Sequence, residues 1–161
     1  MGFWQVILVG CVVLAVAALG VWGVRTWHRK REKAWLTTAS TMFRQRREWL
    51  EADFLSAATA TGKPRGLSWA DCDFSDEISF GRDRRTGQLS AFVSLTIKFE
   101  AVAGGDMEEV EAVALHKLAT AVFHYDGEKW FSNGRAVFNL KPHETIERFG
   151  HHQVLRARSY T

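Results

Sequence analysis

Cysteine and proline are scarce in this chain of 161 residues, and several familiar motifs are missing. The two cysteines are too few for a disulfide framework, and because Cys11 falls within an apolar run, Cys72 has no partner outside it. With two prolines and no run rich in serine and glycine, the sequence excludes a long flexible linker. It also has no Walker-type phosphate loop and no zinc-type ligand spacing. These absences argue against a disulfide-stapled domain, a P-loop nucleotide binder and a zinc site, and no cofactor is predicted.

Charge is also missing from the first 24 residues. Spanning a hydrocarbon core about 30 Å thick takes roughly 20 apolar residues in a helix that rises about 1.5 Å per residue. Residues 3–24 supply this length with one polar interruption, Gln5. A secretory signal would open with basic residues and hold a shorter apolar run, so residues 1–24 are predicted to form an uncut transmembrane anchor. The alternative, lipoprotein cleavage before Cys11, is disfavoured because the apolar run continues beyond that residue.

Positive charge follows the apolar run at once. Five basic residues lie within residues 25–33: Arg25, Arg29, Lys30, Arg31 and Lys33. Because lysine and arginine next to a span are retained on the cytoplasmic side, they predict a single-pass protein with its N-terminus outside and its globular domain in the cytoplasm. The opposite orientation stays open, since short N-terminal anchors often insert the other way. Residues 25–37 are interpreted as a helical, basic juxtamembrane stalk whose five basic side chains contact anionic lipid headgroups.

Net charge is divided unevenly along the chain. Residues 1–47 carry +7 and the remainder carries −4, which together give the +3 of the whole sequence. The basicity therefore belongs mainly to the stalk and favours lipid headgroups over nucleic acid as the partner. Residues 38–150 are enough for one self-sufficient core and too few for two, and residues 151–161 are expected to form a frayed tail.

Apolar periodicity predicts the elements of the globular part. Residues 38–60 carry an apolar stripe at helical spacing, Arg47 and Glu51 are placed as an i,i+4 pair, and Gly62 is expected to end the helix. Residues 89–99 alternate apolar and polar side chains, which is the clearest strand pattern in the chain. The remaining elements are expected to be strands at residues 73–80, 110–125 and 130–140 and a short helix at 142–149.

The order of these elements predicts an α+β fold in which one long amphipathic helix packs on a curved, four-stranded antiparallel sheet. The last hairpin would turn at the Asp126-Gly127 pair before Trp130, and Gly134 would bend its second strand. Residues 119–130 thereby resemble the late hairpin of cystatin-like domains, which include the nuclear-transport-factor-2-like proteins. The resemblance implies a two-layer fold. Since that group includes small enzymes, ligand pockets and interaction modules, it selects no single function.

Candidate catalytic residues are few. Acid–base chemistry in such a fold would need an aspartate or a tyrosine inside the concave sheet, and the possible occupants are Asp71, Asp73, His116, His124 and Tyr125. The weak catalytic candidates among them are Asp71, Asp73 and His116. The two aspartates belong to an acidic cluster that lacks the glycine of a tight calcium loop. His116 and His124 are too far apart along one predicted strand to share a metal ion. The plainer interpretation of the three candidates is a solvated strand face, and no metal site is predicted.

Aromatic side chains offer a different kind of site. Phe92, Trp130 and Phe131 would form a protein-binding patch if exposed, or would pack under a neighbouring strand. Together with the anchor, they favour a membrane-tethered, non-enzymatic binding or assembly module that engages a protein partner or a second copy of itself. The alternative is a small pocket enzyme or ligand-binding domain of the cystatin-like type.

Overall fold

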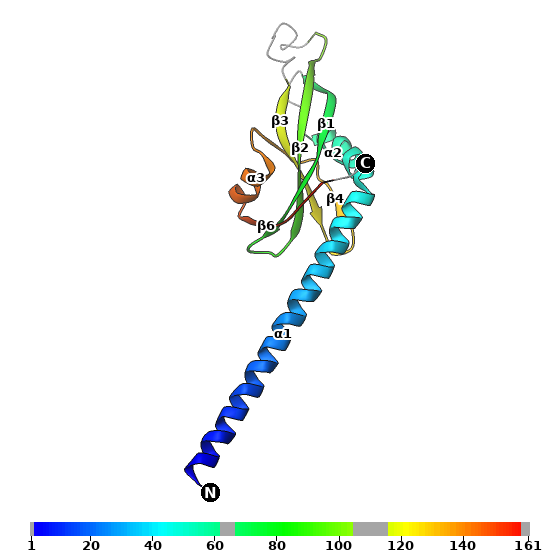
Figure 1. Cartoon of the computed structure of the whole chain (residues 1–161). Coiled ribbons are helices and arrows are strands. Elements are labelled where there is room, and N and C mark those ends of the chain that lie inside the picture. Colours follow the sequence, from blue (N-terminus) through cyan, green and yellow to red (C-terminus); the bar gives the residue numbers. More distant parts are fainter. Residues whose placement is uncertain (1, 62–66, 105–115, 159–161) are drawn as a thin grey trace. The chain divides into compact units, whose positions relative to one another are not determined.

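The computed structural model describes residues 2–61, 67–104 and 116–158 and divides the chain into two compact units, Met1–Ser40 and Thr41–Thr161. The first unit consists almost entirely of helix α1 (Phe3–Gln45), whose last residues belong to the second (Figure 1). The predicted helical course of the stalk is therefore confirmed. The sequence also predicts a transmembrane helix here; within the described residues, no helix is long and apolar enough to cross a membrane.

One antiparallel sheet of six strands makes up most of the second unit. The strands are β1 (Leu67–Asp83), β2 (Leu89–Ala101), β3 (Lys117–Tyr125), β4 (Trp130–Phe131), β5 (Ala136–Phe138) and β6 (His151–Arg158). Their order is β4-β3-β2-β1-β6, with β5 also paired to β3 (Figure 1). The prediction of an α+β fold with helical packing on an antiparallel sheet is confirmed, whereas the predicted number of four strands is wrong.

Two differences from the prediction raise the number of strands. The strand expected at residues 130–140 is divided into β4 and β5, whose pairing with β3 is interrupted between Phe131 and Ala136. Gly134 lies in this interruption with φ +73°, which confirms the predicted bend. The expected frayed tail instead forms β6, in which Ala157 pairs with Ile78 of β1. The sequence pattern of the tail is too polar to indicate a strand, and the open edge of β1 supplies the partner that orders it. Of the strand expected at 110–125, residues 110–115 lie outside the described part of the chain.

The single helix expected at residues 38–60 is divided as well. α1 ends at Gln45, and α2 (Arg47–Thr61) begins after Arg46. The Arg46 N–H is shared between two carbonyl oxygens of the preceding turn, both at 3.2 Å, as is common at helix ends. Gly62, the expected end of the helix, lies outside the described residues.

Arg47 fixes the start of α2 against the sheet. Its Nε donates to Glu51 Oε1 at 2.6 Å, which confirms the predicted i,i+4 pair. One of its terminal nitrogens donates to the Ser75 carbonyl at 2.9 Å, and the other lies 3.4 Å from Asp76 Oδ1. Ser75 and Asp76 lie where the pairing of β1 with β2 shifts register. The guanidinium thus bonds a backbone carbonyl that lies outside the β1–β2 ladder.

Aromatic rings fill the space between the helices and one face of the sheet, here called the inner face. Phe43, near the end of α1, packs edge-to-face on Phe80, Phe123 and Trp130, with ring centroids 5.8, 5.2 and 5.0 Å away. The alternation predicted for residues 89–99 is confirmed, because every second side chain from Leu89 to Phe99 is buried on this face.

The opposite, outer face of the sheet carries a helix of its own. α3 (Pro142–Arg148) confirms the short helix predicted at 142–149. Its Ile146 packs with Phe92 and Val122, which the register places on the face opposite the inner one. Figure 1 shows α3 beside the sheet, away from α2. Helices therefore lie on both faces of the sheet, and the expected two-layer arrangement is corrected.

Candidate binding surface on the outer face of the sheet

α3 covers only part of the outer face, and another part is open to solvent. The register places Asp73 beside Thr96, and Thr96 beside Leu118, in one row across β1, β2 and β3. Leu118 is 59% exposed although its strand is paired on both sides. It therefore offers apolar contact area within a polar row of the sheet.

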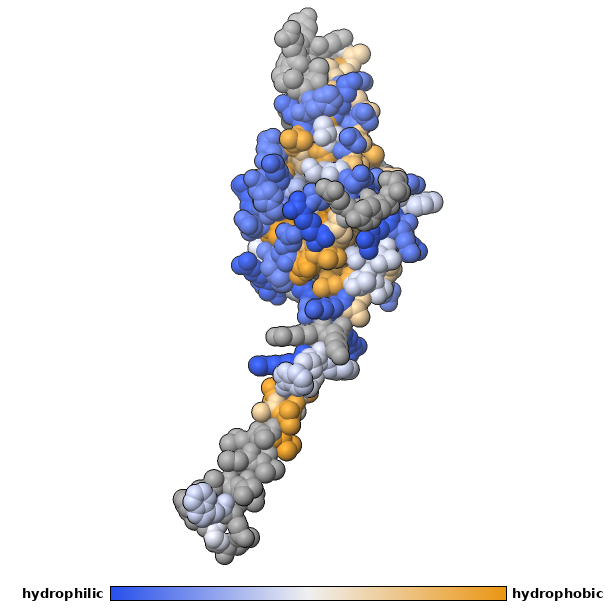
Figure 2. Space-filling model, viewed as in Figure 1, coloured by the Kyte–Doolittle hydropathy of each residue, from blue (hydrophilic) through white to orange (hydrophobic). Residues whose placement is uncertain are grey.

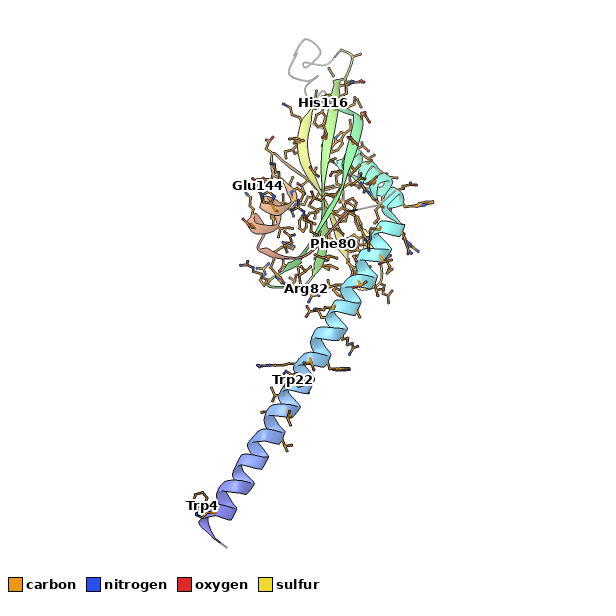
Figure 3. All side chains as sticks on the ribbon, viewed as in Figure 1. Trp4, Trp22, Phe80, Arg82, His116 and Glu144 are labelled. Atoms are coloured by element: carbon orange, nitrogen blue, oxygen red, sulfur yellow. The ribbon has the colours of Figure 1, made fainter. Side chains whose placement is uncertain are left out.

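A groove of about 820 Å³ lies between this open face and α3. Ser79, Ser94 and Leu118 line it from the sheet, and Gln153 lines it from β6. Its charged lining residues carry both signs: Glu77, Lys141, Glu144 and Arg156. We call this feature the outer groove; Glu144, at the start of α3, is labelled in Figure 3.

Hydrogen bonds hold the α3 side of the outer groove in place. Thr120 Oγ1 donates to the Leu140 carbonyl at 2.7 Å, which ties the segment before α3 to β3. The Lys141 N–H donates to Glu144 Oε2 at 2.7 Å and so caps the first turn of α3. Across the groove, Arg156 forms an ion pair with Glu77. The groove is therefore preorganised by bonds that do not depend on a ligand.

The three candidate catalytic residues lie together near one end of the outer face. Asp71, Asp73 and His116 line a depression of about 480 Å³ with Thr96 and Lys98, and Figure 3 shows His116 at this end of the sheet. All three side chains are exposed to solvent. Within the described residues, no group of three or more His, Cys, Asp or Glu could hold a metal ion.

Cys72, between the two candidate aspartates, is half-buried. Burial raises the pKa of its thiol to about 11, and the negative charge of Asp71 acts in the same direction. A thiol that stays protonated at neutral pH is a poor nucleophile, so Cys72 is not a candidate catalytic residue.

The inner face of the sheet does not hold the two candidate aspartates. Asp71, Asp73 and His116 are exposed, and the register of β1 places the two aspartates on the outer face. The catalytic candidates therefore do not lie where the cystatin-like resemblance would place them.

Two of the three aromatic residues expected in a protein-binding patch are buried. Phe92 is 1% exposed under α3, and Trp130 is 7% exposed against Phe43 and Tyr125. The strand pattern correctly separates the two faces around Phe92, but it does not show that α3 covers the outer one. Phe131, at 38% exposure, stays accessible. The predicted patch is therefore reduced to one of its three members.

A serine–histidine pair that the sequence pattern did not indicate lies on the outer face. Ser90 Oγ is 3.1 Å from His124 Nδ1, because β2 and β3 place the two residues opposite each other. Burial lowers the pKa of His124, and the positive charges of Arg135 and His151 lower it further. Ser90 is 0% exposed, so a substrate cannot reach its hydroxyl group. Only knowledge of the strand register could have predicted this pair.

His124 should make stability depend on pH. Its pKa in the folded chain lies below the ordinary 6.5. As the pH falls below about 6.5, the imidazole is therefore protonated more readily in the unfolded chain than in the folded one. The stability that the folded state gains from a neutral His124 is fully present above about pH 6.5, and it is lost as the pH falls through the pKa of His124 in the folded chain. We expect His124→Gln to lose less stability than the unaltered chain between about pH 7 and pH 5, as measured by urea unfolding at each pH. His116→Gln, at an exposed position, serves as the control and should follow the unaltered chain.

The residues predicted to contact lipid headgroups lie on α1. The side chains of Arg25, Arg31 and Lys33 are exposed, and those of Arg29 and Lys30 lie outside the described part. Figure 2 shows apolar surface on the described part of α1. Seven of its large apolar residues are 55–80% exposed: Trp4, Val16, Leu19, Val21, Trp22, Val24 and Trp27.

Comparison with protein-family models, with curated proteins and with solved structures finds no match.

Proposed function

We propose that the protein is a membrane-tethered, non-enzymatic binding module whose outer groove holds an extended segment of a partner protein. The observation that carries the proposal is the groove itself. Its volume of about 820 Å³ is in the range of known ligand sites, and its lining combines Leu118 with serine hydroxyls and charges of both signs. Such a lining suits a polypeptide, which presents backbone hydrogen-bonding groups together with alternating side chains.

The membrane tether rests on the sequence. Residues 3–24 carry no charge, and the five basic residues within 25–33 would hold the start of the domain against anionic headgroups on the cytoplasmic side. The exposed apolar side chains of α1 support this proposal, because leaving such surface in water is unfavourable by about 25 cal/mol per Å². In this interpretation, the cystatin-like resemblance is limited to a helix packed on an antiparallel sheet.

Site-specific photocrosslinking in intact cells tests the groove. A photoreactive phenylalanine analogue at Leu118 should form a covalent adduct with a partner protein, whereas the same analogue at Lys129, in the exposed β3–β4 turn, should not. A further change, Ser94→Arg, would place a long side chain in the groove and should remove the adduct from position 118. If the adduct persists in the Ser94→Arg chain, or if both positions label equally, the groove is not the binding surface. An adduct with a second copy of the chain would identify the partner segment as its own.

A further inference from the structure

Three segments meet at the end of the sheet opposite His116. They are the β1–β2 turn, the end of α3 and the start of β6. The Arg84 N–H donates to the Gly150 carbonyl at 3.2 Å, and Asp83 pairs with His151. Figure 3 shows Arg82 at this end of the sheet and His116 at the other. The turn and the helix end therefore form one continuous surface.

Arginine side chains dominate this surface. The exposed ones are Arg84, Arg85, Arg135 and Arg148. The acids beside them are Asp83 and Glu147. The Asp83 carboxylate already accepts the backbone N–H groups of Thr86 at 2.8 Å and Arg85 at 2.7 Å, which hold its pKa below the ordinary value. Among the described contacts, no ion pair joins this carboxylate to the guanidinium groups of Arg84 or Arg85.

Aromatic rings stand among these cations. The Arg135 guanidinium lies over the Phe149 ring, 4.4 Å from its centroid, and Phe149 is still 38% exposed. Phe131 is also 38% exposed and packs against His124, with ring centroids 5.7 Å apart. His124 in turn interacts electrostatically with Arg135. Guanidinium groups next to half-exposed rings suit an interface that is charged at its surface and apolar just beneath it.

We infer that this arginine–phenylalanine end of the domain binds anionic phospholipid headgroups. The inference rests on the proposed function, because the tether would bring the domain to a bilayer. The globular part has an excess of acidic residues overall, so a long nucleic acid would meet repulsion beyond this end, whereas headgroups need only a local patch. The lipid contact of the protein would thus extend from the predicted stalk to the globular domain.

Hydrogen exchange of the full chain bound to vesicles tests the inference. We expect the amides of residues 84–88 and 147–152 to exchange more slowly with vesicles of phosphatidylcholine and phosphatidylserine in a 7:3 ratio than with phosphatidylcholine alone. Each arginine near an anionic leaflet changes binding about fivefold, so Arg85→Gln/Arg148→Gln should weaken the contact roughly 25-fold and remove this difference. The matched variant Lys117→Gln/Lys129→Gln loses the same amount of charge elsewhere on the domain. It should keep the difference in amide exchange between the two kinds of vesicle.

Two results would overturn the inference. One is equal exchange of these amides on both kinds of vesicle in the unaltered chain. The other is binding of a 20-nucleotide RNA to the unaltered chain that is lost in the Arg85→Gln/Arg148→Gln variant, while anionic vesicles do not slow the exchange of these amides. Carbonate extraction of the same vesicles reports separately whether α1 is inserted. Failure of the tether and failure of this contact are therefore distinguishable.

Discussion

Gly134→Ala is expected to lower the free energy of unfolding by about 2–5 kcal/mol. Gly134 takes φ +73°, a left-handed conformation that costs a residue with a Cβ about 1–2 kcal/mol. A Cβ added there would lie 2.3 Å from Ala58 N and 2.6 Å from Ala57 C, both in the backbone of α2. The helix or the β4–β5 connection would have to move, and overpacking of this kind costs about 1–3 kcal/mol more. Urea unfolding in detergent micelles, followed by tryptophan fluorescence, measures the loss.

Gly87→Ala is the matched control for this substitution. Gly87 also has φ +73°, but nothing lies within 4 Å of a Cβ added there. It should therefore cost only the conformational part, about 1–2 kcal/mol. Equal losses in the two variants would show that the close approach of Gly134 to α2 contributes nothing to stability.

Phe43→Ala should cost about 3–5 kcal/mol, the range of buried aromatic residues replaced by alanine. Phe43 is 1% exposed, and its ring contacts Phe80, Phe123 and Trp130, so its removal leaves a cavity between the end of α1 and the inner face of the sheet. Because Trp130 lies against the lost ring, its fluorescence should also change in the folded state. The same urea titration measures both effects.

Trp49→Ala provides the comparison, because Trp49 is an aromatic residue on α2 that is 77% exposed. Its replacement should change the free energy of unfolding by less than about 0.5 kcal/mol. If Phe43→Ala were as mild as Trp49→Ala, the aromatic cluster would not be the main contact between helix and sheet.

Features that depend on neighbours in the sequence could be predicted without the structure. The alternation at residues 89–99, the Arg47–Glu51 pair, the bend at Gly134 and the helix after Pro142 all follow from spacing or from the backbone freedom of one residue type. In each case the physical cause lies within about four residues of the feature.

Features that depend on distant segments could not be predicted. β6 is ordered by the free edge of β1, and Phe92 is buried by α3, neither of which a local pattern contains. The outer groove likewise needs β1, β3, α3 and β6 to be in place before it exists. The gathering of Asp71, Asp73 and His116 follows from the register of three strands, although the residues themselves could be selected from the sequence.

The pairing of β6 with β1 has a consequence for folding during synthesis. β1 is made early and finds its first neighbour, β2, across a short turn, but its other neighbour follows only after β2, β3, β4, β5 and α3. Until then, one edge of β1 presents unpaired N–H and C=O groups, and exposed edges of this kind recruit strands from other chains. Long-range closure of this type is also slow, because the intervening chain must be ordered first. The outer edge of β1 is therefore where a nascent chain is most open to mispairing, and a chain cut before His151 would keep that edge exposed.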